Sequence, residues 1–195
     1  MADETESTKL KVKKAEKQDI KSMLELNYKI YPPEWHVTEH YVKKIMSKNP
    51  EVYNILTTKD GTKGIVSLFP LNKDIYESIL NGKIEEDDLS EYILDYFTPK
   101  EVYIYLISLI VDVFDPNRKT YAKNIIQSIP FELKRILAKG IDIKEIGAIA
   151  ISPEGEKILP KIGFTQNKEV LSIYNQKYPV FQASVNDVIS SINIK

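Results

Sequence analysis

Residues 101–138 read EVYIYLISLIVDVFDPNRKTYAKNIIQSIPFELKRILA. Both faces of the first part are mainly apolar, and β-branched and aromatic residues dominate it, which predicts an interior strand over Glu101–Val113. The polar turn DPNRKT follows, and an amphipathic pattern then predicts a helix over about Lys119–Lys139. Pro130 lies inside that helix, so the pattern allows either one kinked helix or two helices with Ser128 capping the second.

The turn between this strand and this helix has the general features of a phosphate site. The first N–H groups of a helix have no intrahelical partner and carry partial positive charge. Arg118 and Lys119 add two cations there, and Thr120 adds a hydroxyl. The turn contains no glycine, the residue that allows the backbone to approach a ligand closely. The cations and the helix start therefore favour a phosphorylated ligand, whereas the lack of glycine disfavours its close approach to the backbone.

Composition limits the classes of function. The chain has 195 residues, 43% hydrophobic and 28% charged, as is typical of one globular domain. The net charge of −1 gives no field that would favour nucleic acid or an anionic membrane. The absence of cysteine excludes disulfides and thiolate-bound metals. His36 and His40 have a helical spacing but no HExxH pattern, so no metal site is expected.

The N-terminal part predicts a polar, flexible segment over residues 1–9, without the apolar core of a signal peptide, followed by a strand near Leu10. We expect a cytoplasmic protein. Apolar periodicity predicts a helix over 20–30 and a second one starting after Thr38. The segment YPPEWH between them, Tyr31–His36, is stiffened by two prolines. It is either one wall of a substrate cleft or an ordinary connection whose aromatic side chains fill the edge of the core.

The middle of the chain predicts a hairpin and a helical insertion. Asp60-Gly61 separates two β-rich segments, which is a strong hairpin signal. Residues 73–99 are interpreted as an insertion between two strands of one sheet. They contain a short helix, an acidic group at 85–88 and the segment LSEYILDYF, which predicts an amphipathic helix. We interpret the acidic group as a solvated face and not as a cation site.

The C-terminal third predicts a strand over 143–151, a helix, two closing strands and a short helix capped at Asn186. Ser152-Pro153 places a capping hydroxyl and a proline at the start of the first helix, which ends at Gly163-Phe164. The closing strands are expected at 169–175 and 179–185. The order of elements predicts a single α+β domain built around one mixed sheet.

Two local patterns in this order resemble the GNAT N-acyltransferase family. One is SPEGEKILPKIGF at 152–164, and the other is the strand ISLIVDV with its Pro-Asn-Arg turn and long helix. Most of the chain, 10–175, can be laid on the family's plan. The resemblance implies a central mixed sheet in which strands 101–113 and 143–151 splay apart, acetyl-coenzyme A bound between them, and transfer of its acetyl group to an amine.

The resemblance also implies which residues hold the acetyl-coenzyme A. The pantetheine arm would follow the end of the central strand, and the pyrophosphate would lie on the turn and the helix start. The glycines of the family's turn correspond here to Tyr121 and Lys123, or in the other register to Thr120 and Ala122. The implied binding residues are Leu109, Val111, Val113, Arg118, Lys119, Thr120, Tyr121 and Ala122.

Catalytic residues are less well defined by the resemblance. Leu159 stands where the family often has its catalytic tyrosine, and the central strand has no carboxylate between its two ends. The remaining candidates are Glu34, Ser108 and Tyr174. The acceptor would be a small-molecule or peptide amine approaching over Tyr31–His36. The alternative is a GNAT-like binding or regulatory module that has lost catalysis. The closing strands are compatible with pairing across a homodimer.

Overall fold

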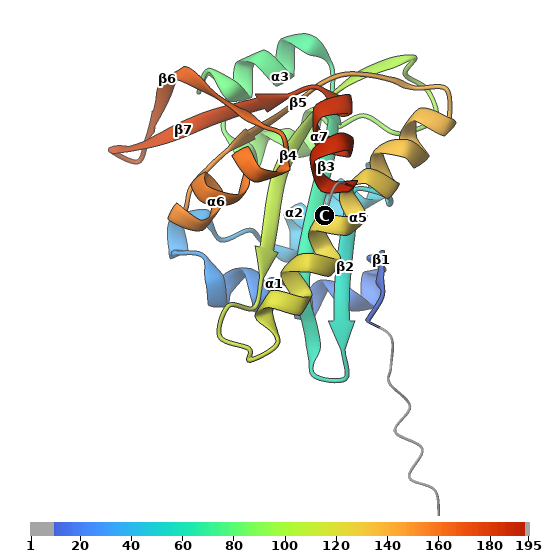
Figure 1. Ribbon diagram of the computed structural model, residues 1–195, viewed down its shortest axis with the longest axis vertical. Coiled ribbons are helices and arrows are strands. Elements are labelled where there is room, and N and C mark those ends of the chain that lie inside the picture. The colour runs from blue at the N-terminus through green and yellow to red at the C-terminus, as the bar shows by residue number, and fades with distance from the viewer. Residues whose placement is uncertain (1–9, 194–195) are drawn as a thin grey trace, which may run out of the picture.

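The computed structural model describes residues 10–193, apart from the side chains of residues 168–170 and 193. The flexible segment expected at 1–9 lies outside the described residues. The described chain forms one seven-stranded sheet with strand order β1-β2-β3-β4-β5-β7-β6 (Figure 1). Only β4 and β5 are parallel neighbours, so the sheet is mixed, and the predicted α+β class is confirmed. The strands are β1 (Val12–Lys14), β2 (Tyr53–Thr58), β3 (Gly61–Leu71), β4 (Glu101–Val111), β5 (Asp142–Ile149), β6 (Thr165–Ile173) and β7 (Gln176–Ala183).

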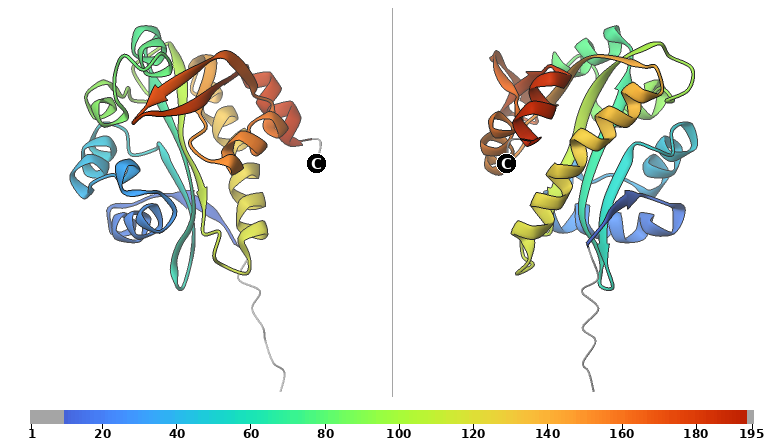
Figure 2. Two further views of the ribbon diagram at one scale, coloured as in Figure 1. Left: turned by 90° about the vertical axis from the view of Figure 1, so that its left-hand side faces the viewer. Right: turned by 45° about the vertical axis from the view of Figure 1, so that its right-hand side comes forward.

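Helices cover both faces of this sheet (Figure 2). The first two lie on one face, and the long α5 crosses the other face together with α7. The α-helices are α1 (Ile20–Ile30), α2 (Glu39–Lys48), α3 (Lys73–Leu80), α4 (Leu89–Tyr92), α5 (Arg118–Ala138), α6 (Pro153–Ile158) and α7 (Val185–Asn193). Four short 3-10 helices accompany them: η1 (Lys17–Asp19), η2 (Pro33–Trp35), η3 (Glu86–Asp88) and η4 (Pro160–Ile162). Among these helices none combines the length and apolar composition that crossing a membrane requires.

The parallel strands β4 and β5 separate halfway along their length. Their pairing begins at Glu101↔Asp142 and stops at Tyr105↔Gly147. Beyond that point each strand keeps only its other neighbour, which is β7 for β5 and β3 for β4. The edge of β4 from Leu106 to Val111 therefore has no strand partner on the β5 side within the described chain. Backbone N–H and C=O groups along such an edge need another partner.

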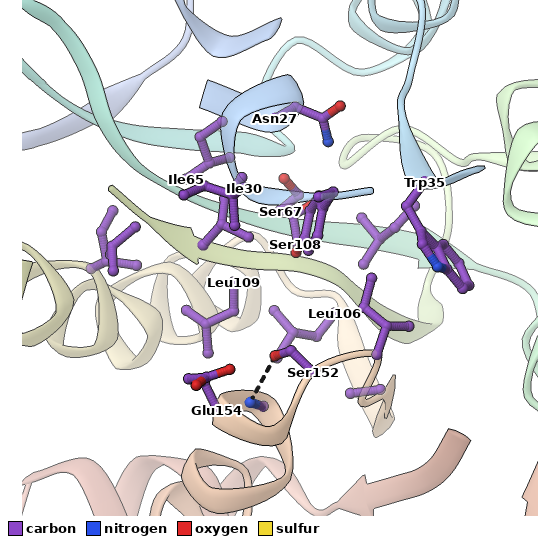
Figure 3. A pocket seen from close by; sticks show the side chains of 18 of the residues that line it. Asn27, Ile30, Trp35, Ile65, Ser67, Leu106, Ser108, Leu109, Ser152 and Glu154 are labelled. Atoms are coloured by element: carbon purple, nitrogen blue, oxygen red, sulfur yellow. Dashed lines mark hydrogen bonds between the residues drawn. The ribbon is translucent and has the colours of Figure 1, made fainter. Parts of the chain in front are cut away.

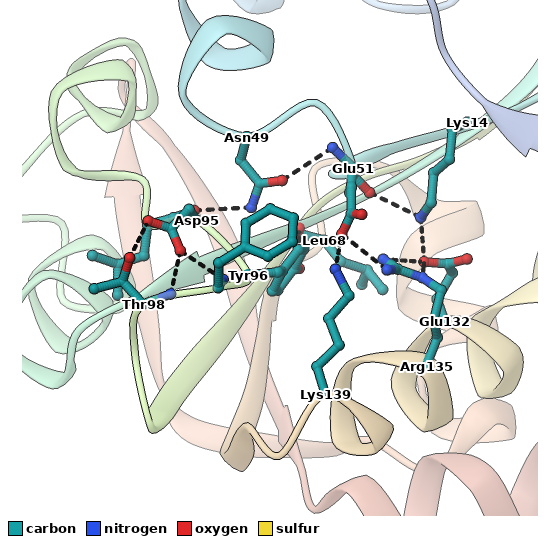
Figure 4. Close-up of polar contacts among 12 residues, drawn as sticks. Lys14, Asn49, Glu51, Leu68, Asp95, Tyr96, Thr98, Glu132, Arg135 and Lys139 are labelled. Atoms are coloured by element: carbon teal, nitrogen blue, oxygen red, sulfur yellow. Dashed lines mark hydrogen bonds and ion pairs between the residues drawn. The ribbon is translucent and has the colours of Figure 1, made fainter.

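The structure corrects the helix expected for LSEYILDYF. The helix ends at Tyr92. The segment after it has no regular secondary structure and is held by side-chain hydrogen bonds (Figure 4). Asp95 Oδ1 accepts hydrogen bonds from the N–H groups of Phe97 and Thr98, both at 2.6 Å. The Tyr96 hydroxyl donates to Leu68 O at 3.0 Å. Aspartate competes well for backbone N–H groups, and these hydrogen bonds hold the segment after the helix in a non-helical path.

Two further expectations about helices are settled by the structure. The long helix α5 is continuous through Pro130. Ser128 does not cap a second helix, because its hydroxyl donates to Ile125 O at 2.6 Å. The last helix is capped two residues earlier than expected, since Ser184 Oγ, and not Asn186, accepts the N–H of Asp187 at 3.1 Å.

The closing strands form a tighter hairpin than expected. Their two-residue turn is Tyr174-Asn175, with φ angles of 50° and 62°. Two successive positive φ angles are typical of the turn that best matches the twist of a hairpin. Tyr174, which the sequence placed on a strand, therefore lies at the tip of the β6–β7 hairpin.

Candidate functional site

A cleft of about 730 Å³ opens where β4 and β5 separate. One wall is β4, the second is α1 with the segment that follows it, and the third combines the start of α5 with the end of β5 and α6 (Figure 3). Ser152 lies on the third wall, and its hydroxyl accepts the N–H of Gly155 at 3.1 Å, so the expected serine cap of α6 faces the cleft. The lining is mainly apolar, with a few polar side chains that converge, as is usual in ligand sites.

A bulge in β4 places polar side chains in the middle of this cleft. Ser67 pairs with Ser108, and the next pair is Leu68 with Leu106, so Ile107 is an extra residue in β4. Because of this extra residue, Tyr105 and Ser108 face the same side of the sheet although they are three positions apart. Ser67 is fully buried, and its hydroxyl has no hydrogen-bond partner among the described residues.

Four exposed cationic side chains line the cleft. Arg118 and Lys119 come from α5, Lys157 comes from α6 and Lys161 from η4. They stand on two sides of the same opening. Such an arrangement suits a ligand that carries several negative charges.

The backbone at the start of α5 offers fewer free donors than the sequence suggested. The N–H of Arg118 donates to Asp115 O at 3.1 Å, and the N–H groups of Thr120 and Tyr121 donate to Asn117 O at 2.9 and 3.1 Å. Among described residues, the N–H of Lys119 has no such backbone partner in this first turn. The charge at this opening is therefore carried mainly by side chains.

The turn before α5 is held by a buried aspartate. Asp112 is 3% exposed, and its carboxylate accepts hydrogen bonds from Lys29 Nζ at 2.8 Å and from Lys63 Nζ at 3.3 Å. Burial alone would raise the pKa of Asp112, but the two ammonium groups lower it below its ordinary value. Asp112 Oδ1 also accepts the N–H of Phe114 at 3.2 Å, which fixes the path of the turn.

At the other end of the cleft, Glu86 is surrounded by tyrosines. The Tyr105 hydroxyl donates to Glu86 Oε1, and the Tyr41 hydroxyl donates to Glu86 O at 2.9 Å. Burial raises the pKa of Glu86 to about 7, with the Tyr105 hydrogen bond opposing and the charge of Asp87 adding to the shift. Tyr31 lines the cleft beside them, and burial followed by the charge of Glu86 raises its pKa. Glu86 can thus gain or lose a proton near neutral pH.

An aromatic contact joins two distant segments at this end. Trp35, in η2, lines the cleft, and its ring centroid lies 5.5 Å from those of Tyr174 and Tyr178 on the β6–β7 hairpin. Both contacts are edge-to-face, a favourable geometry for aromatic pairs. His36 supports the same loop, since its Nε2 lies 2.8 Å from Tyr31 O. We call the three rings of Trp35, Tyr174 and Tyr178 the aromatic bridge.

Comparisons with known proteins identify this architecture. No protein-family model matches the chain, and no curated protein is significantly similar in sequence. Solved structures do match. The loading GNATL domain of CurA from Lyngbya majuscula superposes with a TM-score of 0.69 at 10% identity, covering 91% of this chain and 98% of that chain. A GNAT-family acetyltransferase from Bacillus cereus matches with a TM-score of 0.52 at 13% identity, covering 89% and 94%.

The chain has the GNAT fold. Naa50 from Arabidopsis thaliana, solved in complex with the bisubstrate analogue CoA-Ac-MVNAL, matches with a TM-score of 0.57 at 11% identity, covering 90% of this chain and 98% of that chain. The resemblance drawn from SPEGEKILPKIGF and from the central strand and turn is confirmed at the level of the fold. At these identities, the roles of individual residues have to be argued from the cleft itself.

Only some of the site residues expected from the sequence line the cleft. Glu34 is exposed on η2, Tyr174 is 54% exposed at the hairpin tip, and Thr120 is exposed on the first turn of α5. Tyr121 is 4% exposed and turns into the core. These four lie outside the described lining of the cleft. Those that line it are Ser108, Leu109, Val111, Val113, Arg118, Lys119 and Ala122.

Sequence reasoning missed several residues of the cleft. Glu86 was interpreted as part of a solvated acidic group, and Ser67 and Asn27 were not singled out. Asn27 is 8% exposed and lines the cleft, with Oδ1 accepting the N–H of Val37 at 3.2 Å. Lys157 and Lys161 were noted only as helix residues. The local sequence carries no signal for these roles, because they depend on which distant segments meet at the cleft.

Proposed function

We propose that this protein is an acyltransferase that takes an acyl group from acyl-coenzyme A and transfers it to an amine. The open edge of β4, exposed where β5 turns away after Tyr105↔Gly147, is the observation that carries the proposal. Acyl-coenzyme A is the substrate here. Its pantetheine arm contains two amides in an extended chain, which can pair with an unpartnered strand edge as an added strand would.

The charges and shape of the cleft support the same substrate. The phosphate groups of acyl-coenzyme A carry several negative charges, and Arg118, Lys119, Lys157 and Lys161 provide four cations in the lining of the cleft. The glycine-free turn is compatible with such binding. Ala122 is the small residue that faces the cleft, whereas the bulky Tyr121 side chain is buried away from it.

The chain's own groups provide what acyl transfer needs. The open edge of β4 provides backbone N–H donors for a carbonyl oxygen, which need no particular side chain. Ser108 lies on the opposite face of β4 from Leu109, towards α1, where an acceptor can meet the acyl group. Holding two reactants in one cleft can account for much of the acceleration of such a reaction.

Thermal unfolding with and without acetyl-coenzyme A tests the proposal. A ligand at about 100 times its dissociation constant stabilises the native state by about 2.7 kcal/mol, which corresponds to a rise in Tm of roughly 5–10 °C in a chain of this size. The double variant Arg118→Ala, Lys119→Ala should lose most of this rise. The charge-matched control Lys83→Ala, Lys134→Ala removes two exposed lysines outside the cleft and should keep it.

Two results would change the conclusion. No rise in Tm at millimolar acetyl-coenzyme A would refute acyl-coenzyme A as the substrate. A rise in Tm without acylation of any amine would instead favour a binding module with the GNAT fold.

A further inference from the structure

We infer that the Glu86 end of the cleft is the acceptor site, that it takes a small amine carrying at least one further positive charge, and that Glu86 accepts the proton which the reacting nitrogen loses. This inference rests on the proposed acyltransferase function and adds the class of acceptor and the identity of the base. It starts from the opposite charges at the two ends of the cleft.

Four carboxylates gather around Tyr174 next to the Glu86 part of the cleft, and Glu86 is the one among them that lines it. Glu34 comes from η2, while Glu85, Glu86 and Asp87 come from the segment around η3. All four lie close enough to Tyr174 for their negative charge to reinforce the effect of burial in raising the pKa of its phenol. An amine with two positive charges is attracted to this end, and a ligand with several phosphates is attracted to the other.

Glu86 is the carboxylate placed to touch the acceptor. It lines the cleft, and Tyr105 donates to only one of its oxygens, Oε1. No described side chain donates to Oε2, so this oxygen remains available to an ammonium group. The backbone carbonyl of Glu86 is tied to the Tyr41 hydroxyl at 2.9 Å, which holds the residue in position. A fixed carboxylate with one free oxygen is well suited to bind an amine and then to accept its proton.

A second, independent observation indicates a polar ligand in the same cleft. Ser67 is 0% exposed and lines the cleft, yet its hydroxyl has no hydrogen-bond partner in the described chain. Leaving a buried hydroxyl without a hydrogen-bond partner destabilises the folded state, and a polar ligand can supply that partner. Ser108 stands directly opposite it on β4. The two hydroxyls, seen together in Figure 3, offer contacts to a polar group of the acceptor.

The aromatic bridge limits the size of the acceptor. Trp35, on the second wall of the cleft, contacts Tyr174 and Tyr178 on the hairpin. Tyr174 lies near Glu86, so the bridge lies at the acceptor end. A polypeptide acceptor would need an open path for the chain that continues from its reactive amine. A small amine needs none, and the faces of Trp35 and Tyr31 can hold its second cationic group.

The reaction is balanced without any further reactant. The nitrogen of the acceptor forms a bond to the acyl carbon, and the carbon–sulfur bond of the thioester breaks. Its electron pair leaves on sulfur as the thiolate of coenzyme A. An acceptor bound as an ammonium group loses two protons: the first goes to Glu86 and on to solvent before the nitrogen attacks, and the second passes from the acylated nitrogen to Glu86 or to the thiolate.

Calorimetric titration of the protein without coenzyme A tests the acceptor site separately from the donor site. The probes are spermidine, 1,4-diaminobutane, butylamine and a seven-residue peptide with a free N-terminus. The two polycationic amines should bind at least about tenfold more tightly than butylamine, and the peptide should not compete with them. The double variant Glu85→Gln, Asp87→Asn should reduce this preference. The control Glu25→Gln, an exposed acid of α1 outside the cleft, should leave it unchanged.

Turnover tests the role of Glu86. Glu86→Gln should lower kcat by about 10²–10⁴ while the affinity for acetyl-coenzyme A stays within twofold of the wild type. Glu86→Asp should recover part of the rate. Equal binding of butylamine and diamines, tighter binding of the peptide, or unchanged kcat in Glu86→Gln would overturn the inference. Failure of acetyl-coenzyme A to bind the wild type would refute the proposed function, whereas these amine results concern only the acceptor site.

Discussion

The raised pKa of Glu86 predicts a specific effect on stability. Burial moves the pKa of this carboxyl from 4.5 in its ordinary environment to about 7 in the folded protein. Between these two values the folded chain holds a proton that the unfolded chain releases. The free energy of unfolding therefore falls as pH rises from about 4.5 to 7 and is level above that range. At 1.36 kcal/mol for each pKa unit, the ionised Glu86 costs the folded state at most about 3 kcal/mol at pH 8.

Glu86→Gln removes this cost and keeps the size of the side chain, and its amide oxygen can still accept the Tyr105 hydroxyl. We expect the variant to be about 2–3 kcal/mol more stable than the wild type at pH 8 and nearly equal to it at pH 4.5. Urea unfolding at both pH values measures the two differences. In a chain of this size, the gain at pH 8 corresponds to roughly 4–12 °C in Tm. A difference that is the same at both pH values, or a loss of stability at pH 8, would refute the placement of Glu86.

Three further substitutions test the packing and the ion pairs of the elements around the cleft. Gly64→Ala places a methyl group 2.7 Å from Ile125 Cγ1. This overpacking should lower the free energy of unfolding by about 1–3 kcal/mol, as measured by urea titration. An unchanged free energy of unfolding would mean that α5 does not cross β3 so closely. Asp112→Asn should destabilise the protein by about 1–3 kcal/mol at pH 7. This difference should be full above the ordinary aspartate pKa of 3.8 and should be lost progressively as pH falls from there through the lowered pKa of the folded Asp112. A difference that persists at pH 2 would contradict the ionic role. Pro130→Ala restores an N–H inside α5 and should raise Tm by a few degrees; a decrease would show that packing of the buried ring outweighs the hydrogen bond.

The pH dependence of transfer follows from the same carboxyl. Glu86 must be ionised to accept a proton, so kcat should rise with pH through about 7. The groups that face it are Tyr105 on β4, Tyr41 on α2 and Tyr31 after α1, with Tyr174, Glu34, Glu85 and Asp87 around the opening. Tyr105→Phe removes the hydrogen bond that lowers the pKa of Glu86. The rise in kcat should therefore move to higher pH in this variant, and an unmoved profile would exclude Glu86 as the base.

Local patterns were sufficient to predict most of the fold. The strand at 101–113, its polar turn and the long helix depend on neighbouring residues, and the structure has them as β4 and α5 within two residues. The hairpin before the insertion is also confirmed, with Gly61 at a φ of 103° where glycine is favoured. In these segments propensity, periodicity and turn chemistry agree with the final packing.

The chemistry of the cleft could not be predicted in the same way. Glu86 looked solvated because its neighbours in sequence are acidic. Its environment comes from Tyr41 and Tyr105, which are 45 and 19 residues away along the chain. Likewise, the loss of glycine in the turn before α5 looked damaging in sequence. The structure places the Tyr121 side chain in the core and Ala122 towards the cleft, a distinction that depends on how α5 is rotated against the sheet.

Amide chemical-shift mapping by NMR during titration with acetyl-coenzyme A tests the central claim most directly. If the ligand enters where β4 and β5 separate, the largest changes should fall on Leu106–Val111 and on the first turn of α5, with β1 and β2 unaffected. Arg118→Ala with Lys119→Ala should weaken the response without changing its location. Changes concentrated elsewhere, or none at millimolar ligand, would contradict an acyl-coenzyme A site between the separated strands.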